Sequence, residues 1–132
     1  MAQEYRHKTT SVSLINYHLI WCPKRRRRVL VNAVQVRLDG LIREVAAELD
    51  CTVLVLEIMP AHVHLCLSAP PTLAPNQIVR RIKGRSSRVL RQEFPHLLRL
   101  PSLWTRAYFV STAGHVSSQT IQRYIAEQRT RG

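Results

Sequence analysis

The sequence predicts an α+β fold: a ferredoxin-like split βαβ sandwich with an antiparallel sheet and an additional C-terminal helix. The hydrophobic period alternates between two and about 3.6 residues, in the order strand, helix, strand, strand, helix, strand, helix. Proline residues stand at several of the points where the period changes. The length and the lack of an internal repeat indicate one domain spanning residues 1–132.

The first half of the chain supplies a strand, a helix and a hairpin. Residues 11–22 are rich in β-branched and aromatic side chains and predict a strand that ends at Pro23. Residues 33–49 carry apolar side chains at helical spacing, which predicts an amphipathic helix. Residues 51–59 are almost entirely apolar, which is typical of a central strand covered on both faces. Residues 62–67 form the next strand, so the sequence MPA becomes a hairpin turn.

The second half begins with a proline-rich loop and then returns to helical spacing. Residues 76 to about 93 predict a second helix with an apolar stripe and many arginines. A fourth strand is expected near residues 105–111. The last helix is expected at about residues 117–129, with Ser117 or Ser118 as its N-cap.

The charge balance indicates a polyanionic partner. Lysine and arginine number 20 against 8 acidic residues, giving a net charge of +12. Guanidinium groups bind phosphate oxygens in a bidentate manner, so nucleic acid is the first expectation and a basic ribosomal or membrane-surface protein the alternative. The expected phosphate contacts lie on the loop after the first strand and on the second helix: Arg25, Arg26, Arg27, Arg28, Arg81, Lys83, Arg85 and Arg88.

Two further features bear on the cellular compartment. No apolar run reaches the ~18 residues of a membrane span, and the first residues lack the apolar core of a secretory signal. Cys22, Cys51 and Cys66 are an odd, scattered set, which argues against a disulfide framework. We therefore expect a cytoplasmic protein without a membrane partner.

The sequence PAHVHLC places two histidines on one strand. Residues i and i+2 of a strand share a face, so His62 and His64 point the same way with Cα atoms about 6.6 Å apart. Such a pair can hold a metal ion, or it can be two surface or hydrogen-bonded histidines. Cys66 shares the face, but it lies about 13 Å from His62 along the strand, which disfavours a zinc site of these three.

The last helix carries Tyr124 and Gln128 four residues apart, so both lie on one face. A tyrosine near an apolar stripe is commonly structural. Alternatively, a metal on the histidines acts as a Lewis acid on a phosphodiester. The Gln128 amide oxygen is then a further ligand for a hard cation, and Tyr124 is a nucleophile that forms a covalent intermediate.

Five segments together resemble the single-tyrosine HUH transposases of small insertion sequences, including their REP-associated relatives. They are YHLIWCPKRRRRVL, MPAHVHLCL, IKGRSSRVLRQEFP, LWTRAYFVSTAG and IQRYIAEQ, in the family's order and over nearly the whole chain. The resemblance implies that His62, His64 and Gln128 bind Mg²⁺ or Mn²⁺ and that Tyr124 is the nucleophile. It also implies a homodimer with joined sheets that cuts and rejoins single-stranded DNA hairpins through a 5′-phosphotyrosine.

The sequence departs from the family at two places. Ala61 stands where many relatives carry an acidic or amide residue before the first histidine. The basic loop has arginines where relatives often have an aromatic residue. Any role of these two positions in the family is therefore not carried over to this chain.

Three other functions remain open from the residues. An RNA-recognition module shares the predicted fold, but KGRSS lacks the aromatic residues on which such modules stack bases. A two-histidine phosphoesterase needs a second histidine motif, for which Tyr17–His18 is the only nearby candidate. A domesticated relative that acts on genomic hairpin repeats would differ mainly in its flanking DNA.

Overall fold

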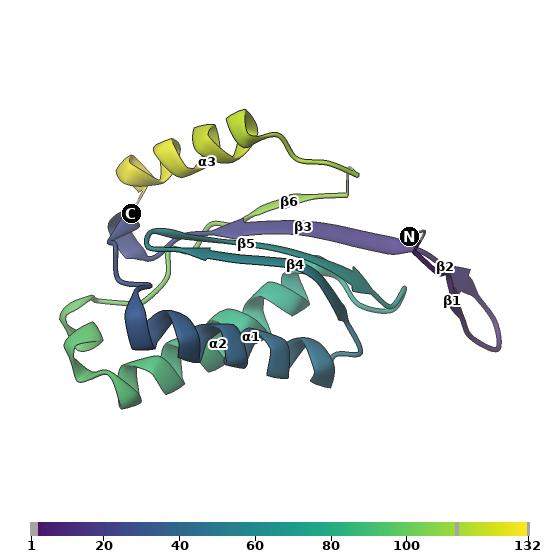
Figure 1. Cartoon of the computed structure of the whole chain (residues 1–132), viewed down its shortest axis with the longest axis horizontal. Coiled ribbons are helices and arrows are strands. Elements are labelled where there is room, and N and C mark those ends of the chain that lie inside the picture. The colour runs from purple at the N-terminus through teal and green to yellow at the C-terminus, as the bar shows by residue number, and fades with distance from the viewer. Residues whose placement is uncertain (1–2, 113, 132) are drawn as a thin grey trace.

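The computed structural model describes residues 3–112 and 114–131. It contains strands, helices and two 3-10 turns in an order that agrees with the predicted one (Figure 1). The elements are β1 (Arg6–His7), β2 (Val12–Ser13), β3 (Ile15–Trp21), η1 (Lys24–Arg26), α1 (Asn32–Glu48), β4 (Thr52–Met59), β5 (His62–Ala69), α2 (Pro75–Glu93), η2 (Pro95–Arg99), β6 (Phe109–Ser111) and α3 (Ser118–Arg131).

Four strands form one antiparallel sheet in the order β4-β5-β3-β6. Helices α1 and α2 cover one face of this sheet and α3 lies over the other (Figure 1). The strand order places β5 between the two strands that α1 connects, which is the split βαβ arrangement. The predicted fold class is therefore confirmed.

The core lies between the sheet and the α1–α2 layer. Along α1 the buried apolar side chains recur at helical spacing, as expected, and α2 contributes a second stripe. From the sheet, Val63, Leu65 and Leu67 of β5 are fully buried in the same cluster. Trp104 belongs to the same core, and its indole N–H donates a 3.0 Å hydrogen bond to the Ser86 hydroxyl of α2.

Two strands differ from expectation. β4 is an outer strand rather than a central one, and Leu54, Val55 and Met59 are exposed by 41%, 41% and 48%. An apolar run does not distinguish a central strand from an edge strand, because that difference depends on the sheet order. The fourth strand spans only Phe109–Ser111, since the residues before it bond to the loop after β3 instead.

Three small features were not expected from the sequence: the turn η1 in the arginine loop, the turn η2, and a hairpin of β1 with β2. This hairpin takes Val12–Ser13 out of the single strand predicted over residues 11–22. β1 and β2 form a two-stranded hairpin at the N-terminal end, held to the main sheet by the Arg6 guanidinium, which donates to the Ser68 hydroxyl and carbonyl. The turn η2 follows α2. No helix in the described part of the chain is long and apolar enough to cross a membrane.

Candidate functional site

The two histidines of β5 lie on the sheet face that α3 covers. Their neighbours Val63 and Leu65 point into the opposite, α1–α2 side, so the alternation of β5 sends both imidazoles toward α3. His62 is half-buried and His64 is 9% exposed. The expectation that these histidines share one face is confirmed.

The surroundings of both imidazoles favour the neutral ring. Burial lowers the pKa of His62, and the nearby His64 and Arg26 lower it further. Burial also lowers the pKa of His64, although Glu57 opposes this shift from the adjacent strand. A histidine binds a metal ion through the lone pair of a ring nitrogen, which only the neutral ring offers, so the lowered pKa values favour coordination.

A third histidine lies beside His64. His18 of β3 is 9% exposed, and its Nδ1 lies 3.3 Å from Nε2 of His64. The sequence marked His18 only as a candidate for a second phosphoesterase motif. Its contact with His64 depends on the register of β3 against β5, which no local pattern reveals.

Cys66 contacts His18. Its Sγ lies 3.8 Å from His18 Nε2, and burial raises the pKa of the thiol. Among the described residues, no three His, Cys, Asp or Glu side chains gather closely enough to hold a metal ion. The structure therefore does not gather His62, His64 and Cys66 around one point, and all three cysteines are free and buried.

Helix α3 carries the other two candidate residues, Tyr124 and Gln128. Ser117 caps the helix, since its hydroxyl accepts the Thr120 N–H at 3.1 Å, which confirms one of the two expected caps. Tyr124 is half-buried, and its ring centroid lies 5.9 Å from that of Phe109. Phe109 is two strands away from His64 by register, or about 10 Å, so Tyr124 stands toward the β6 side of the histidines.

Gln128 is fully buried one turn beyond Tyr124. Among the described residues its amide nitrogen and oxygen have no hydrogen-bond partner. An unpaired buried amide lowers the free energy of unfolding by about 1–3 kcal/mol, so Gln128 destabilises the fold when nothing is bound to it. An amide oxygen aimed at no protein donor fits a metal ligand of the type that a hard cation prefers.

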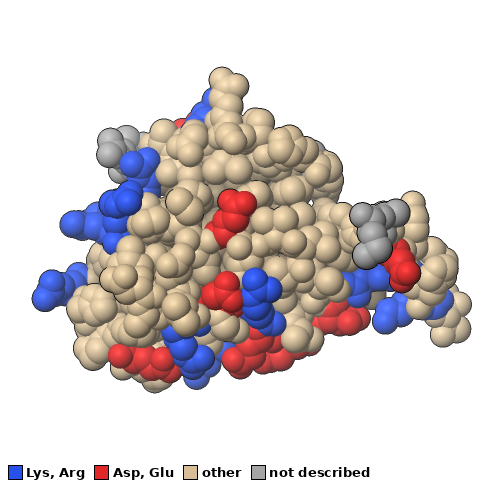
Figure 2. Space-filling view, viewed as in Figure 1, with Lys and Arg blue, Asp and Glu red and all other residues tan. Residues whose placement is uncertain are grey.

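The arginine loop meets this face beside His62. Arg26 and Arg28 line a hollow of about 190 Å³ together with His62, Gln122 and Ile125. Arg25 and Arg26 have φ angles of 57° and 52°, in the left-handed region that costs an L-residue about 1–2 kcal/mol. Figure 2 shows Lys and Arg side chains gathered at this end of the molecule.

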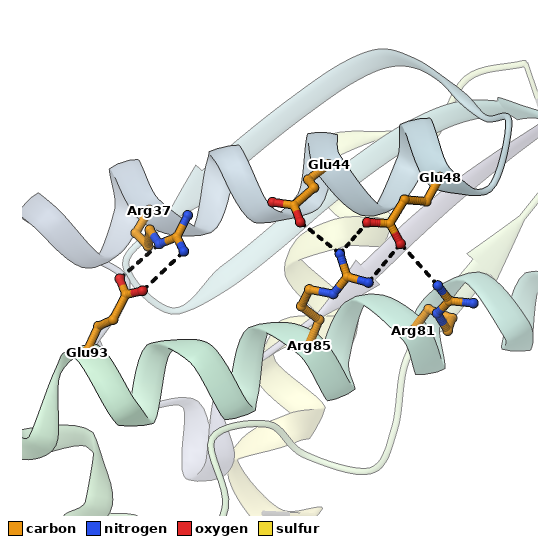
Figure 3. Close-up of polar contacts among 6 residues, drawn as sticks. All are labelled: Arg37, Glu44, Glu48, Arg81, Arg85 and Glu93. Carbon is orange, nitrogen blue, oxygen red and sulfur yellow. Dashed lines mark hydrogen bonds and ion pairs between the residues drawn. The ribbon is translucent and has the colours of Figure 1, made fainter.

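The arginines of α2 lie on the other side of the sheet. Arg85 bonds to Glu44 and Glu48 of α1, and Arg81 bonds to Glu48 (Figure 3). Arg88 is exposed. The structure thus does not bring these residues to the histidines, and it engages two of them in ion pairs. Their contact with phosphate stays a prediction.

Lys83 is also engaged within the protein. Its Nζ donates 2.9 Å hydrogen bonds to the carbonyls of Thr105 and Ala107, and lies 5.9 Å from the centroid of the Tyr108 ring. Burial lowers its pKa to about 8. Lys83 thereby fixes the segment before β6, and its predicted phosphate contact is untested.

A larger cavity opens next to His64 on the same face. It measures about 530 Å³, and its lining includes His18, His64, Glu57, His115 and Ile121. The cavity lies between the sheet and the start of α3. The cavity beside His64 is therefore as large as typical small-molecule sites and has room for a ligand.

Known proteins resemble this chain in sequence and in fold. The model of the IS200-like transposases matches residues 11–128. The ISDra2 transposase TnpA of Deinococcus radiodurans is 39% identical over 117 residues, covering 86% of this chain and 84% of that protein. The transposase of insertion sequence IS200 from Salmonella typhimurium is 29% identical over 115 residues, covering 85% and 75%.

Two solved structures share the fold. A protein described as a transposase from Deinococcus radiodurans R1 matches with a TM-score of 0.86 and 35% identity, over 93% of this chain and 97% of that one. A REP-associated tyrosine transposase bound to a REP hairpin matches with a TM-score of 0.53 and 15% identity, over 95% and 68%. The matched residues include the four-stranded sheet, the histidine pair and most of the last helix, and the chain belongs to the family of IS200-like transposases.

Proposed function

We propose that this transposase cleaves and rejoins single-stranded DNA at hairpin-bearing ends, through a 5′-phosphotyrosine on Tyr124 and with Mg²⁺ or Mn²⁺. The observation that carries the proposal is the sheet face shared by His62 and His64, covered by the helix that bears Tyr124 and Gln128. Family membership makes the chain a DNA-processing enzyme. The residues of this face supply the parts that such a reaction needs.

The donor set supports a divalent cation. His62 and His64 offer two imidazoles whose lowered pKa values keep them unprotonated. Gln128 offers an amide oxygen that no described group uses. These two nitrogens and one neutral oxygen would hold Mg²⁺ or Mn²⁺ on the face where the DNA phosphate is expected to bind. When bound, the ion would polarise the phosphodiester as a Lewis acid.

Tyr124 would perform the covalent step. A phenol ionises near pH 10, so its oxygen needs a proton acceptor or a nearby cation in order to attack at neutral pH. The Tyr124 oxygen forms a bond to phosphorus while the bond from phosphorus to the 3′ oxygen breaks. The 3′ oxygen leaves as a hydroxyl after gaining a proton, and the 5′ phosphate stays on Tyr124. Attack by another 3′ hydroxyl reverses these steps and rejoins the strands.

The arginine loop would guide the DNA to this face. Arg26 and Arg28 line the hollow beside His62, and Arg25 and Arg27 are exposed on the same loop. One structural neighbour was solved with a REP hairpin, which motivates hairpin DNA as the substrate to test. We propose that these four arginines contact its phosphates, because guanidinium groups pair with phosphate oxygens.

We also propose a homodimer that joins through a sheet edge. β4 is the longer of the two outer strands, and it carries the exposed apolar side chains of Leu54, Val55 and Met59. Outer strands with exposed apolar side chains readily pair with another chain. A second copy along β4 would extend the sheet and cover these residues.

The decisive experiment is incubation with single-stranded hairpin DNA and Mg²⁺, followed by denaturing electrophoresis. We expect a protein–DNA adduct that resists denaturation. Tyr124→Phe should bind the hairpin and form no adduct, whereas Tyr5→Phe, at a residue 58% exposed, should form it normally. An adduct of normal yield in Tyr124→Phe would exclude Tyr124 as the nucleophile, and hairpin binding without any adduct in the wild type would favour a binding module.

A further inference from the structure

His18 is a buried histidine that the proposed ligand set does not use. Its Nδ1 lies 3.3 Å from Nε2 of His64, and the two rings are stacked with centroids 5.6 Å apart and planes inclined by 28°. Both side chains are 9% exposed. The two histidines belong to neighbouring strands whose register fixes their separation, so the sheet itself builds this contact.

The other side of the His18 ring meets Cys66. Cys66 lies directly opposite His18 in the β3–β5 register, and its Sγ is 3.8 Å from His18 Nε2. Because burial raises the pKa of this thiol, the sulfur is a weak hydrogen-bond partner rather than a thiolate. Cys66, His18 and His64 therefore form one chain of contacts across two strands.

The direction of the hydrogen bond between His18 and His64 decides whether His64 can bind a metal ion. A hydrogen bond between two neutral imidazoles requires a proton on one nitrogen and a lone pair on the other. If His18 Nδ1 donates, His64 Nε2 accepts, and His64 then carries its own proton on Nδ1. Both nitrogens of His64 would be occupied, and neither could coordinate an ion.

The opposite direction leaves a ligand nitrogen. If His64 donates from Nε2–H to His18 Nδ1, the lone pair of His64 Nδ1 remains available. His18 then carries its proton on Nε2, where the Cys66 sulfur can accept it. Both ring N–H groups, on His64 and on His18, then have an acceptor.

We propose that His18 is a positioning residue for His64: it accepts the His64 Nε2–H, fixes the ring and its tautomer, and leaves Nδ1 for the metal ion. This inference rests on the metal role proposed above. Metal-binding histidines commonly donate their second ring N–H to a neighbouring acceptor, which is usually a carboxylate or a carbonyl. Here the acceptor is a second imidazole, itself held by Cys66.

The first test measures the tautomer without any metal. Nitrogen NMR of histidine-labelled protein, with His64 assigned by comparison with His64→Ala, should show the wild-type His64 ring protonated on Nε2. His18→Leu, which keeps a similar bulk, should shift His64 toward a mixture of tautomers. His18→Asn should restore the Nε2–H form, because its side-chain oxygen can take the place of Nδ1. An unchanged His64 ring in His18→Leu would overturn the proposal.

The second test measures Mn²⁺ binding by calorimetry in the absence of DNA. Loss of such a supporting contact typically weakens metal binding about 10–100-fold, which is the loss we expect for His18→Leu. His18→Asn should recover most of the affinity, which a purely structural effect of losing the ring would not allow. His96→Leu, an exposed histidine on η2, is the matched control and should bind as the wild type does.

The two tests separate this inference from the proposed function. If His64→Ala leaves Mn²⁺ affinity unchanged, the ion does not bind at His64, and both the metal role and the positioning role are overturned. If His64→Ala abolishes binding while His18→Leu keeps the wild-type affinity, the metal site stands and the role of His18 is overturned. Weakened binding in His18→Leu with recovery in His18→Asn supports both.

Discussion

The two faces of the sheet differ in how their cations are used. On the α1–α2 face, Arg81 and Arg85 pair with glutamates of α1, and Arg37 pairs with Glu93 (Figure 3). On the α3 face, the arginine loop borders a hollow with His62 and is folded into a strained turn. Three arginines of the first face neutralise acidic neighbours, whereas Arg26 and Arg28 of the second line a hollow beside His62. The count of positive charges on an element therefore does not measure its affinity for phosphate.

The largest expected effect follows from removing a histidine of the α3 face. His64→Ala should lower metal-dependent cleavage of hairpin DNA by at least about 100-fold, because a metal ion supplies several kcal/mol of charge stabilisation to the transition state. Hairpin affinity should stay nearly unchanged, since it depends on phosphate contacts. Cleavage rates and gel-shift affinities measure both. His96→Ala on the other side should leave cleavage intact, and full cleavage in His64→Ala would refute the comparison.

The two groups of arginines can be compared through the salt dependence of binding. Arg25→Gln with Arg27→Gln should lower the slope of log affinity against log salt by about 1.4–1.8, since each lost phosphate contact contributes about 0.7 on single strands and about 0.9 on duplex. Arg81→Gln with Arg85→Gln should change the slope much less, because glutamates already compensate these charges. Measuring the affinity for hairpin DNA between about 50 and 200 mM salt gives the slope for each variant. A larger change for Arg81 and Arg85 would contradict this comparison and would indicate that the DNA phosphates bind along α2.

A smaller effect is expected from Gln128, the buried amide of α3. Gln128→Leu should raise the free energy of unfolding by about 1 kcal/mol without metal, because two unpaired polar atoms leave the interior. The same change should weaken Mn²⁺ binding. Urea unfolding and calorimetry measure the two quantities. Gln119→Leu, on the exposed side of the helix, is the control, and a loss of stability in Gln128→Leu would show that the amide is satisfied after all.

A further effect, which depends on pH, is expected from Lys83 of α2. Burial lowers its pKa from 10.5 to about 8, so above pH 8 the folded protein releases this proton while the unfolded chain still binds it. The unfolded state then holds more protons, and stability contributed at this residue rises with pH between about 8 and 10.5. Cys22, with a thiol pKa raised to about 11 by burial, stays protonated over most of this range.

Urea unfolding from pH 7 to pH 10 checks this contribution. The difference in unfolding free energy between the wild type and Lys83→Met should change in favour of the wild type as the pH rises. Lys24→Met controls for the loss of one positive charge. A difference that is independent of pH would show that Lys83 keeps its proton throughout, and would favour a charged role for it.

The sequence by itself determined the periodic elements and the candidate site. Apolar side chains at helical spacing predicted α1 and α2, and alternation along β5 set His62 and His64 on one face, because period alone fixes which side chains share a face. Ser117 and Ser118 predicted where α3 begins, and Ser117 is its cap. The spacing of Tyr124 and Gln128 predicted that both lie on one face of α3.

The tertiary structure alone decided which residues meet. The sheet order makes β4 an outer strand. The side chain of His18 contacts His64, and Arg81 and Arg85 form ion pairs with glutamates of α1. Each of these contacts joins residues more than 30 positions apart in sequence. Local periodicity specifies the direction of a side chain from its own element, whereas its partner depends on strand register and helix packing, which arise only when the whole chain buries its apolar surface together.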